Sequence, residues 1–164
     1  TYKALAARED LQAVASHLDV RAVPEFADTT NLPGILNDCH AVVDCLDDIS
    51  ARRMVEQAAH AANIPFIHGA IAGLEGFALI SLPPKARTDI SASSTGSAVS
   101  DLYGSDDIPA EERAEYRLGV SSPTPVAVAV LQTLLTLRFL TGKPLNPGLL
   151  HIDLAIPEIE LLHR

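Results

Sequence analysis

The sequence is poor in the residues that several kinds of site and partner require. Its 164 residues include no tryptophan, aromatic residues make up 4%, and only three residues are lysine. Few lysines and a net charge of −9 argue against nucleic acid or an anionic membrane as the partner, because both attract basic surfaces. No apolar run approaches the roughly 20 residues that span a bilayer, and no secretory signal is visible.

The two cysteines, Cys39 and Cys45, belong to no CxxC motif. The six histidines show no ligand spacing such as H-x-x-x-H, so we expect no structural zinc site. Cys45 could act as a nucleophile, but an apolar strand among carboxylates would raise its pKa, which favours a small buried hydrophobe. With no disulfide expected, a reducing cytoplasm is the natural compartment.

What the chain has in abundance is aliphatic residues, with 48% hydrophobic residues overall. This length predicts one domain, 1–164, with a substantial core. Strands that alternate with helices predict an α/β sheet, and the aliphatic core suits helices laid on parallel strands. Strands are expected at 20–23, 41–46, 64–67, 76–82, 149–154 and 159–162, and helices at 4–15, 30–36 (capped by Thr30), 50–62 and 126–140.

Two segments stand out from this pattern. Val126–Leu140 follows Pro123 and Pro125, which are tolerated at a helix start, and it is apolar almost all round. A helix of that kind is expected to be buried, and because a small domain cannot cover every side of it, a homodimer seam is predicted. Pro83–Arg117 is rich first in serine and then in acidic residues. A connection of this length is usually functional, or else a solvated surface loop.

The most informative segment is Val42–Asp48, followed by Ile49–Arg53. It predicts a buried strand that gives way to acidic residues and then a helix. Ligands of open α/β sheets bind at the carboxyl ends of strands, so Asp47 is placed to hold Mg²⁺ against a nucleotide phosphate. The simpler interpretation is that Asp47 or Asp48 caps the next helix.

Four sequence motifs, in the same order as in one protein family, favour the ligand-binding interpretation of this segment. Asp44–Asp48 with Arg52 resembles the D-C-T-D-N-x-x-x-R motif of the ThiF/MoeB/HesA family, the ubiquitin-activating-enzyme-like adenylyltransferases. Pro65–Gly76 resembles the P-x-V-x-G-A…G-x-x-G strand pair of that family. The run from Gly119 to Gly142 resembles its G-V…P…L-Q-A-x-E-A-I-K…G helix, and Lys3–Arg8 resembles its K-V-E-x-A helix start.

The resemblance implies a Rossmann-like open sheet with helices on both faces, as in the C-terminal part of a ThiF-type fold. The family's glycine-rich phosphate loop lies upstream of the segment that Lys3 matches, so we expect the domain to be N-terminally incomplete. ATP and Mg²⁺ are implied as cofactors, with Lys3, Leu46 and Asp47 at the nucleotide, Asp47 on the metal, and Asp47, Lys3 and Arg52 as the catalytic residues. From the residues alone, Lys3 is an ordinary exposed lysine and Arg52 an ion-pair partner of Asp44, Asp47 or Asp48.

The resemblance also implies a partner, a ubiquitin-like sulfur carrier of the ThiS or MoaD type. Its C-terminal glycine would be adenylylated, in thiamine or molybdenum-cofactor synthesis. Gly69, Gly73 and Gly76 would approach the carrier tail together with a crossover loop, 83–117. These glycines do not form a G-x-G-x-x-G fingerprint, and turn geometry is their simpler role. His68 is expected to be packed or hydrogen-bonded rather than catalytic.

Two other functions remain open from the sequence. One is a non-catalytic, dimeric carrier-binding scaffold, because Asp48 replaces the asparagine of the motif and Leu135 replaces the usual glutamate of the helix. The other is a fragment of a dinucleotide-binding oxidoreductase, which the α/β pattern also fits.

Overall fold

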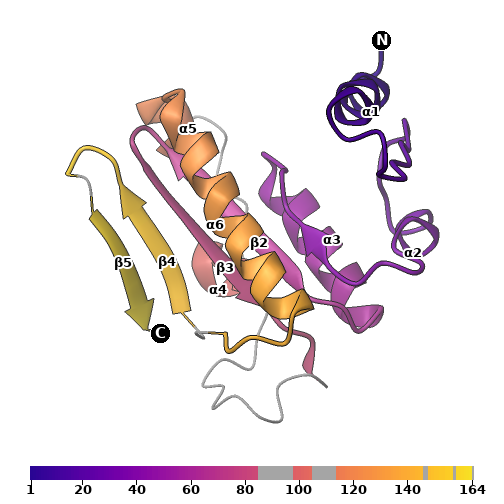
Figure 1. Cartoon of the computed structure of the whole chain (residues 1–164). Coiled ribbons are helices and arrows are strands. Elements are labelled where there is room, and N and C mark those ends of the chain that lie inside the picture. The colour runs from indigo at the N-terminus through magenta and orange to yellow at the C-terminus, as the bar shows by residue number, and fades with distance from the viewer. Residues whose placement is uncertain (85–97, 105–113, 146–147, 157, 164) are drawn as a thin grey trace. The chain divides into compact units, whose positions relative to one another are not determined.

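The computed structural model describes residues 1–84, 98–104, 114–145, 148–156 and 158–163. The chain folds into two compact units, Thr1–Ile35 and Leu36–Arg164. The smaller unit contains two helices, α1 (Lys3–Val14) and α2 (Leu32–Ile35) (Figure 1). The predicted helix 4–15 is therefore confirmed almost to the residue.

Two predictions for the smaller unit are wrong. Residues 20–23 form no strand, because no strand of the described part of this unit is there to pair with them. Thr30 does not cap the short helix. Instead, the Asp28 carboxylate accepts hydrogen bonds from the backbone N–H groups of Thr30 and Asn31, at 2.8 and 3.0 Å. The Thr30 hydroxyl also donates to this carboxylate and is the first cause of the lowered pKa of Asp28, followed by the backbone N–H groups.

The larger unit is built on a five-stranded sheet in the order β1-β2-β3-β4-β5. Among these five strands as the structure describes them, β1 and β2 are parallel and the other neighbouring pairs are antiparallel, so the sheet is mostly antiparallel where parallel strands were expected. The strand predicted at 41–46 is short, although the Asp44 N–H continues its pairing by donating to the Ile67 carbonyl at 2.9 Å. The strands are β1 (Val42–Val43), β2 (Phe66–Ala72), β3 (Glu75–Ser81), β4 (Gly148–Asp153) and β5 (Glu158–His163).

Helices cover both faces of this sheet, as predicted. Side chains alternate along β2, so Ile67 faces one helix layer while His68 faces the other. Helix α6 (Pro123–Leu140) lies across β2 and β3 on the first face (Figure 1). Helices α3 (Ile49–Ala61) and α4 (Ala98–Tyr103) lie on the opposite face, and the short α5 (Ala114–Leu118) precedes α6. The main hydrophobic cluster comprises Ile67, Ala78, Val128, Leu131, Leu135 and Ile152.

Helix α6 is buried on one side and exposed on the other, as expected for an apolar helix that a small domain cannot cover completely. One face packs on the sheet through Val128, Leu131 and Leu135. The other is apolar but exposed in this single chain and comprises Val126, Val130, Leu134, Leu137 and Leu140. With 18 residues and a mean hydropathy of 1.4, α6 is long and apolar enough to cross a bilayer by length and composition alone. Core helices of soluble proteins meet the same criterion, so this is weak evidence for a membrane span.

Glycine lets α6 approach the sheet closely. A Cβ atom on Gly69 would lie 2.6 Å from the Gln132 side chain, and one on Gly76 would lie 2.5 Å from Cγ2 of Val128. Gly69 lies inside β2 and Gly76 inside β3, whereas Gly73 forms the turn between the strands with a left-handed φ of +59°. The first two glycines thus make room for a helix, and the third allows a turn.

We predict that Gly76→Ala lowers the free energy of unfolding by about 1–3 kcal/mol, because the added methyl overpacks the contact with Val128. Urea denaturation monitored by circular dichroism measures this loss. In a Val128→Ala background the same substitution should cost less, since the clashing methyl groups are absent. Equal costs in both backgrounds would contradict the proposed contact.

Candidate functional site

The loop after β1 carries three aspartates in three different environments. Asp44 is buried, with 3% of its surface exposed. Asp48 is the N-cap of α3, and its carboxylate accepts a hydrogen bond from the Ala51 N–H at 2.9 Å. Asp47 is exposed, and its carboxylate has no hydrogen-bond or ion-pair partner among the described residues. The capping interpretation is therefore confirmed for Asp48, and Asp47 is left available to bind a ligand.

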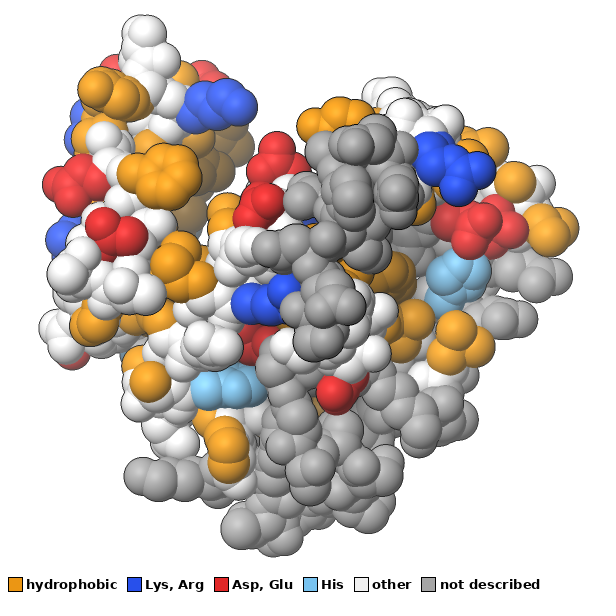
Figure 2. All heavy atoms as spheres, turned by 180° about the vertical axis from the view of Figure 1, so that it is seen from behind, with side chains coloured by type: hydrophobic (Ala, Val, Ile, Leu, Met, Phe, Trp, Pro, Cys, Tyr) orange, Lys and Arg blue, Asp and Glu red, His pale blue; other side chains and the backbone are white. Residues whose placement is uncertain are grey.

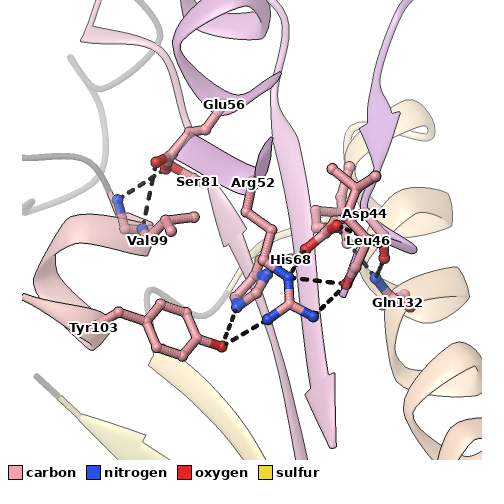
Figure 3. Close-up of polar contacts among 11 residues, drawn as sticks. Asp44, Leu46, Arg52, Glu56, His68, Ser81, Val99, Tyr103 and Gln132 are labelled. Carbon is pink, nitrogen blue, oxygen red and sulfur yellow. Dashed lines mark hydrogen bonds and ion pairs between the residues drawn. The ribbon is translucent and has the colours of Figure 1, made fainter. Parts of the chain in front are cut away.

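The Asp44 carboxylate is held by a fully buried histidine. Oδ2 of Asp44 lies 2.5 Å from Nδ1 of His68, which β2 carries on the face opposite α6 (Figure 3). From the α6 side, Nε2 of Gln132 donates to the backbone carbonyls of Asp44 and Ile67, at 2.7 and 3.2 Å. The end of β1 is thus fixed from both faces of the sheet.

Arg52, on the first turns of α3, completes this cluster. Its Nε lies 3.3 Å from Oδ2 of Asp44 and donates to the Leu46 carbonyl at 3.0 Å, and Nη2 donates to the same carbonyl. The Leu46 N–H donates to Oδ1 of Asp44 at 2.8 Å. Of the three ion-pair partners considered for Arg52, the structure selects Asp44. The guanidinium therefore holds the backbone of the residue that precedes Asp47.

Tyr103, at the end of α4, joins the cluster from a distant part of the chain. Its hydroxyl oxygen lies 3.1 Å from Nε2 of His68 and accepts a hydrogen bond from Nη1 of Arg52 at 3.2 Å (Figure 3). One arrangement of protons satisfies every contact: His68 donates from Nδ1 to Asp44 and accepts at Nε2 from the Tyr103 hydroxyl. In this arrangement the imidazole is neutral.

The pKa of His68 agrees with a neutral ring. Burial is the largest influence and lowers the pKa of His68, while the hydrogen bond that His68 donates to the Asp44 carboxylate raises it. The 2.5 Å contact taken alone would suggest a charged imidazolium, but the nearby Arg52 cation opposes that charge. We therefore treat His68 as neutral at pH 7, packed and hydrogen-bonded as the sequence predicted.

A second buried carboxylate, that of Glu56 in α3, was not predicted. It is fully buried and accepts hydrogen bonds from the Ser81 hydroxyl at 2.6 Å and from the N–H groups of Ala98 and Val99, at 2.8 and 3.3 Å. The first turn of α4 is thereby attached to α3. A helical spacing of four from Arg52 was the available signal, because it places Glu56 on the same buried face.

The remaining sequence predictions concern a lysine, two cysteines and a loop. Lys3 is exposed at the start of α1, in the smaller unit. Cys39 and Cys45 are exposed rather than buried, and the pKa of Cys45 is raised, first by partial burial and then by Asp44. The predicted loop 83–117 is described only at 83–84, 98–104 and 114–117. On the face of the larger unit away from α6, acidic, basic and histidine side chains lie near one another (Figure 2).

Comparison with known proteins gives a consistent result. The model of the ThiF family matches residues 1–162. The chain is 29% identical over 155 residues to the sulfur carrier protein ThiS adenylyltransferase of Bacillus subtilis (strain 168), covering 93% of this chain and 42% of that protein. It is 27% identical over 74 residues to the molybdopterin-synthase adenylyltransferase of Escherichia coli (strain K12), covering 45% of this chain and 30% of that protein.

Solved structures support the same fold. The crystal structure of PaaA has a TM-score of 0.68 at 20% identity over 99% of this chain, and E. coli MccB with ATP has 0.67 at 17% over 98%. Each match covers 47% of the other chain. The chain therefore spans less than half the length of these relatives.

The His68 environment predicts a specific pH dependence of stability. Because the folded pKa lies below the ordinary value of 6.5, the unfolded chain binds a proton that the folded chain does not as pH falls through 6.5. The contribution of His68 to the free energy of unfolding is therefore fully present above pH 6.5. It is lost as the pH falls from 6.5 to the folded pKa, with a slope of at most about 1.4 kcal/mol per pH unit.

Urea denaturation from pH 5 to 8 tests this expectation. His68→Gln should remove this part of the acid sensitivity, whereas His17→Gln makes the same change at an exposed position and serves as the control. A stability difference between wild type and His68→Gln that does not vary with pH would contradict it.

Proposed function

This chain belongs to the ThiF family, and we propose that the protein adenylylates the C-terminal glycine of a small ubiquitin-like sulfur carrier protein. The reaction would consume ATP and release pyrophosphate. The names of the two curated relatives support it, since both are adenylyltransferases and one acts on ThiS. Because one name refers to ThiS and the other to molybdopterin synthase, carriers of both the ThiS and MoaD types are candidates.

The observation that carries this proposal is the state of Asp47. Its exposed carboxylate follows β1 at the carboxyl end of the strand, where α/β sheets bind ligands. The described residues contain no group of three or more metal-binding side chains. The single exposed carboxylate of Asp47 fits Mg²⁺, which is commonly held by one or two carboxylates together with substrate phosphates. When bound, Mg²⁺ would offset the negative charge of the phosphates.

Three residues of the chain have separate proposed roles in the reaction. We propose that Asp47 holds the metal and that Lys3 supplies a cation for the phosphate charge that develops as pyrophosphate leaves. Arg52 was predicted to be catalytic, but its guanidinium is engaged by Asp44, Leu46 and Tyr103. Its proposed role is to fix the loop that presents Asp47.

The carrier tail is assigned to the β2–β3 hairpin and the 83–117 segment. Gly73 forms the hairpin turn. Its N–H donates a hydrogen bond to the Gly119 carbonyl, and its own carbonyl accepts hydrogen bonds from the Ser121 and Thr124 hydroxyls. Gly69 and Gly76 are covered by α6, which accounts for glycine at both positions without the tail. We therefore propose that the carrier tail passes Gly73 rather than Gly69 or Gly76.

We further propose that the protein is a homodimer in which the exposed apolar face of α6 packs against a second copy. An apolar stripe on a helix stabilises a protein only when another surface covers it. A second α6 would supply a self-complementary surface around a two-fold axis.

We predict that Asp47→Asn abolishes carrier-dependent ATP–pyrophosphate exchange, because the amide cannot supply the negative charge that Mg²⁺ requires. The assay uses the full-length protein with ThiS-type and MoaD-type carriers. Asp48→Asn is the matched control, since it removes an equal charge one residue away and asparagine still caps α3. It should remain active.

Two results would count against this function. If the Asp47→Asn variant still catalyses ATP–pyrophosphate exchange, the proposed metal site is not in this loop. Absence of exchange with every carrier, from a correctly folded wild-type protein, would favour the non-catalytic scaffold instead.

We predict that Leu134→Glu converts the dimer to a monomer, because a charge in an apolar seam loses its hydration without gaining a partner. Sedimentation velocity measures the change in mass. Val14→Glu introduces the same charge at an exposed residue of α1 and should leave the dimer intact. A wild-type protein that is monomeric at micromolar concentration would contradict the proposed seam.

A further inference from the structure

Helix α4 is attached to the larger unit by polar contacts at both of its ends. At its start, the buried Glu56 carboxylate accepts the N–H groups of Ala98 and Val99. At its end, the Tyr103 hydroxyl contacts His68 and Arg52, and the Gly104 carbonyl accepts a hydrogen bond from Arg53. Three of these four partners, Arg52, Arg53 and Glu56, lie on α3, so α3 and α4 are joined along the length of α4.

A continuous set of contacts leads from Tyr103 to Asp47. The Tyr103 oxygen accepts from Nη1 of Arg52, whose Nε and Nη2 donate to the Leu46 carbonyl. Leu46 is also held through its N–H by Asp44, and it immediately precedes Asp47 in the chain. Because no contact to the Asp47 carboxylate is present among the described residues, its position depends on the backbone that Arg52 holds.

We propose that Tyr103 is a positioning residue for the metal site: by orienting the Arg52 guanidinium on the Leu46 carbonyl, it sets the position of the Asp47 backbone. Docking of α4 and the geometry of the nucleotide site are therefore coupled. Tyr103 itself touches no reacting atom. The inference rests on the proposed function for its catalytic consequence, but the contacts that it concerns are independent of any substrate.

The surroundings of Tyr103 make a one-atom substitution informative. Its ring packs edge-on against His68 at 5.8 Å between centroids, and the Arg52 guanidinium lies 5.9 Å from the ring centre. Tyr103→Phe keeps both ring contacts and removes only the hydroxyl. Arg52 then loses an acceptor and His68 loses a donor, while Asp44 and Glu56, the other charged groups near His68, are unchanged.

The first measurement is amide hydrogen exchange of the full-length protein, which needs no activity. In Tyr103→Phe, the Leu46 amide should exchange roughly 2- to 10-fold faster, as expected for the loss of one hydrogen bond. The Leu135 amide in the core helix α6 should be unaffected. Tyr116→Phe makes the same chemical change at a tyrosine that is 69% exposed, and it should match wild type at both positions.

The second measurement is the Mg²⁺ dependence of carrier-dependent ATP–pyrophosphate exchange. Tyr103→Phe should raise the half-saturating Mg²⁺ concentration about 2- to 10-fold, with a smaller effect on the rate at saturating Mg²⁺. This separation distinguishes positioning from a general loss of folded protein, which would lower the rate at every Mg²⁺ concentration.

The two measurements separate failure of this inference from failure of the proposed function. Wild-type protein without exchange activity would overturn the function, and Leu46 protection would still test the positioning role. Active Tyr103→Phe protein with wild-type Mg²⁺ dependence would overturn the inference alone. Equal loss of protection at Leu46 and Leu135 would also overturn it, because the hydroxyl would then support only overall stability.

Discussion

The buried carboxylate of Asp44 is the constraint around which the larger unit is organised. A charge removed from water is costly unless ion pairs and hydrogen bonds replace its hydration. Asp44 obtains them from His68 in β2, Arg52 in α3 and the N–H of Leu46. Meeting this requirement brings β2, α3 and the loop between β1 and α3 to one point, and it restricts the path of the chain after β1.

The same requirement explains the second buried carboxylate. Glu56 lies one helical turn after Arg52 on the buried face of α3, and its partners are Ser81 of β3 and the first N–H groups of α4. Buried charged groups often contribute more to a unique arrangement than to stability, and that argument fits this site. An apolar residue at position 56 could fill the space, but it would leave the start of α4 without acceptors for its N–H groups.

The elements that sequence periodicity predicted well are those with a clear apolar pattern of their own, even where their neighbours are distant in the chain, as for β3, which pairs with β4. Helices α1, α3 and α6 and strands β3 to β5 lie within a few residues of their expected bounds. The strand expected at 20–23 failed because β structure needs a partner that local sequence does not specify. An incompletely covered α6 was expected, but the face that meets the sheet was not predicted, because an all-round apolar pattern does not distinguish one side of the helix from another.

Whether a site contact could be predicted depended on how far apart its two residues are in the sequence. Asp48 as a cap and Arg52 as a partner of Asp44 could be inferred from a spacing of three to eight residues. The contacts of Tyr103 with Arg52 and His68 join residues 51 and 35 positions apart, and those of Glu56 with Ala98 join residues 42 apart. Pairings at such separations depend on the sheet and its helices being in place, so no local pattern could reveal them.

The three aspartates after β1 show how environment assigns roles to identical side chains. Asp44 faces the interior and is bound on all sides, while Asp48 turns back to the first turn of α3. A cation could engage either only by displacing contacts that the fold itself requires. The Asp47 carboxylate makes no such contact within the described residues, and its backbone is held through the hydrogen bond that Arg52 donates to the Leu46 carbonyl. A carboxylate that is free while its backbone is fixed loses little conformational entropy on binding a ligand. This difference, rather than the acidic character of the motif as a whole, makes Asp47 the residue of the three best suited to hold a metal.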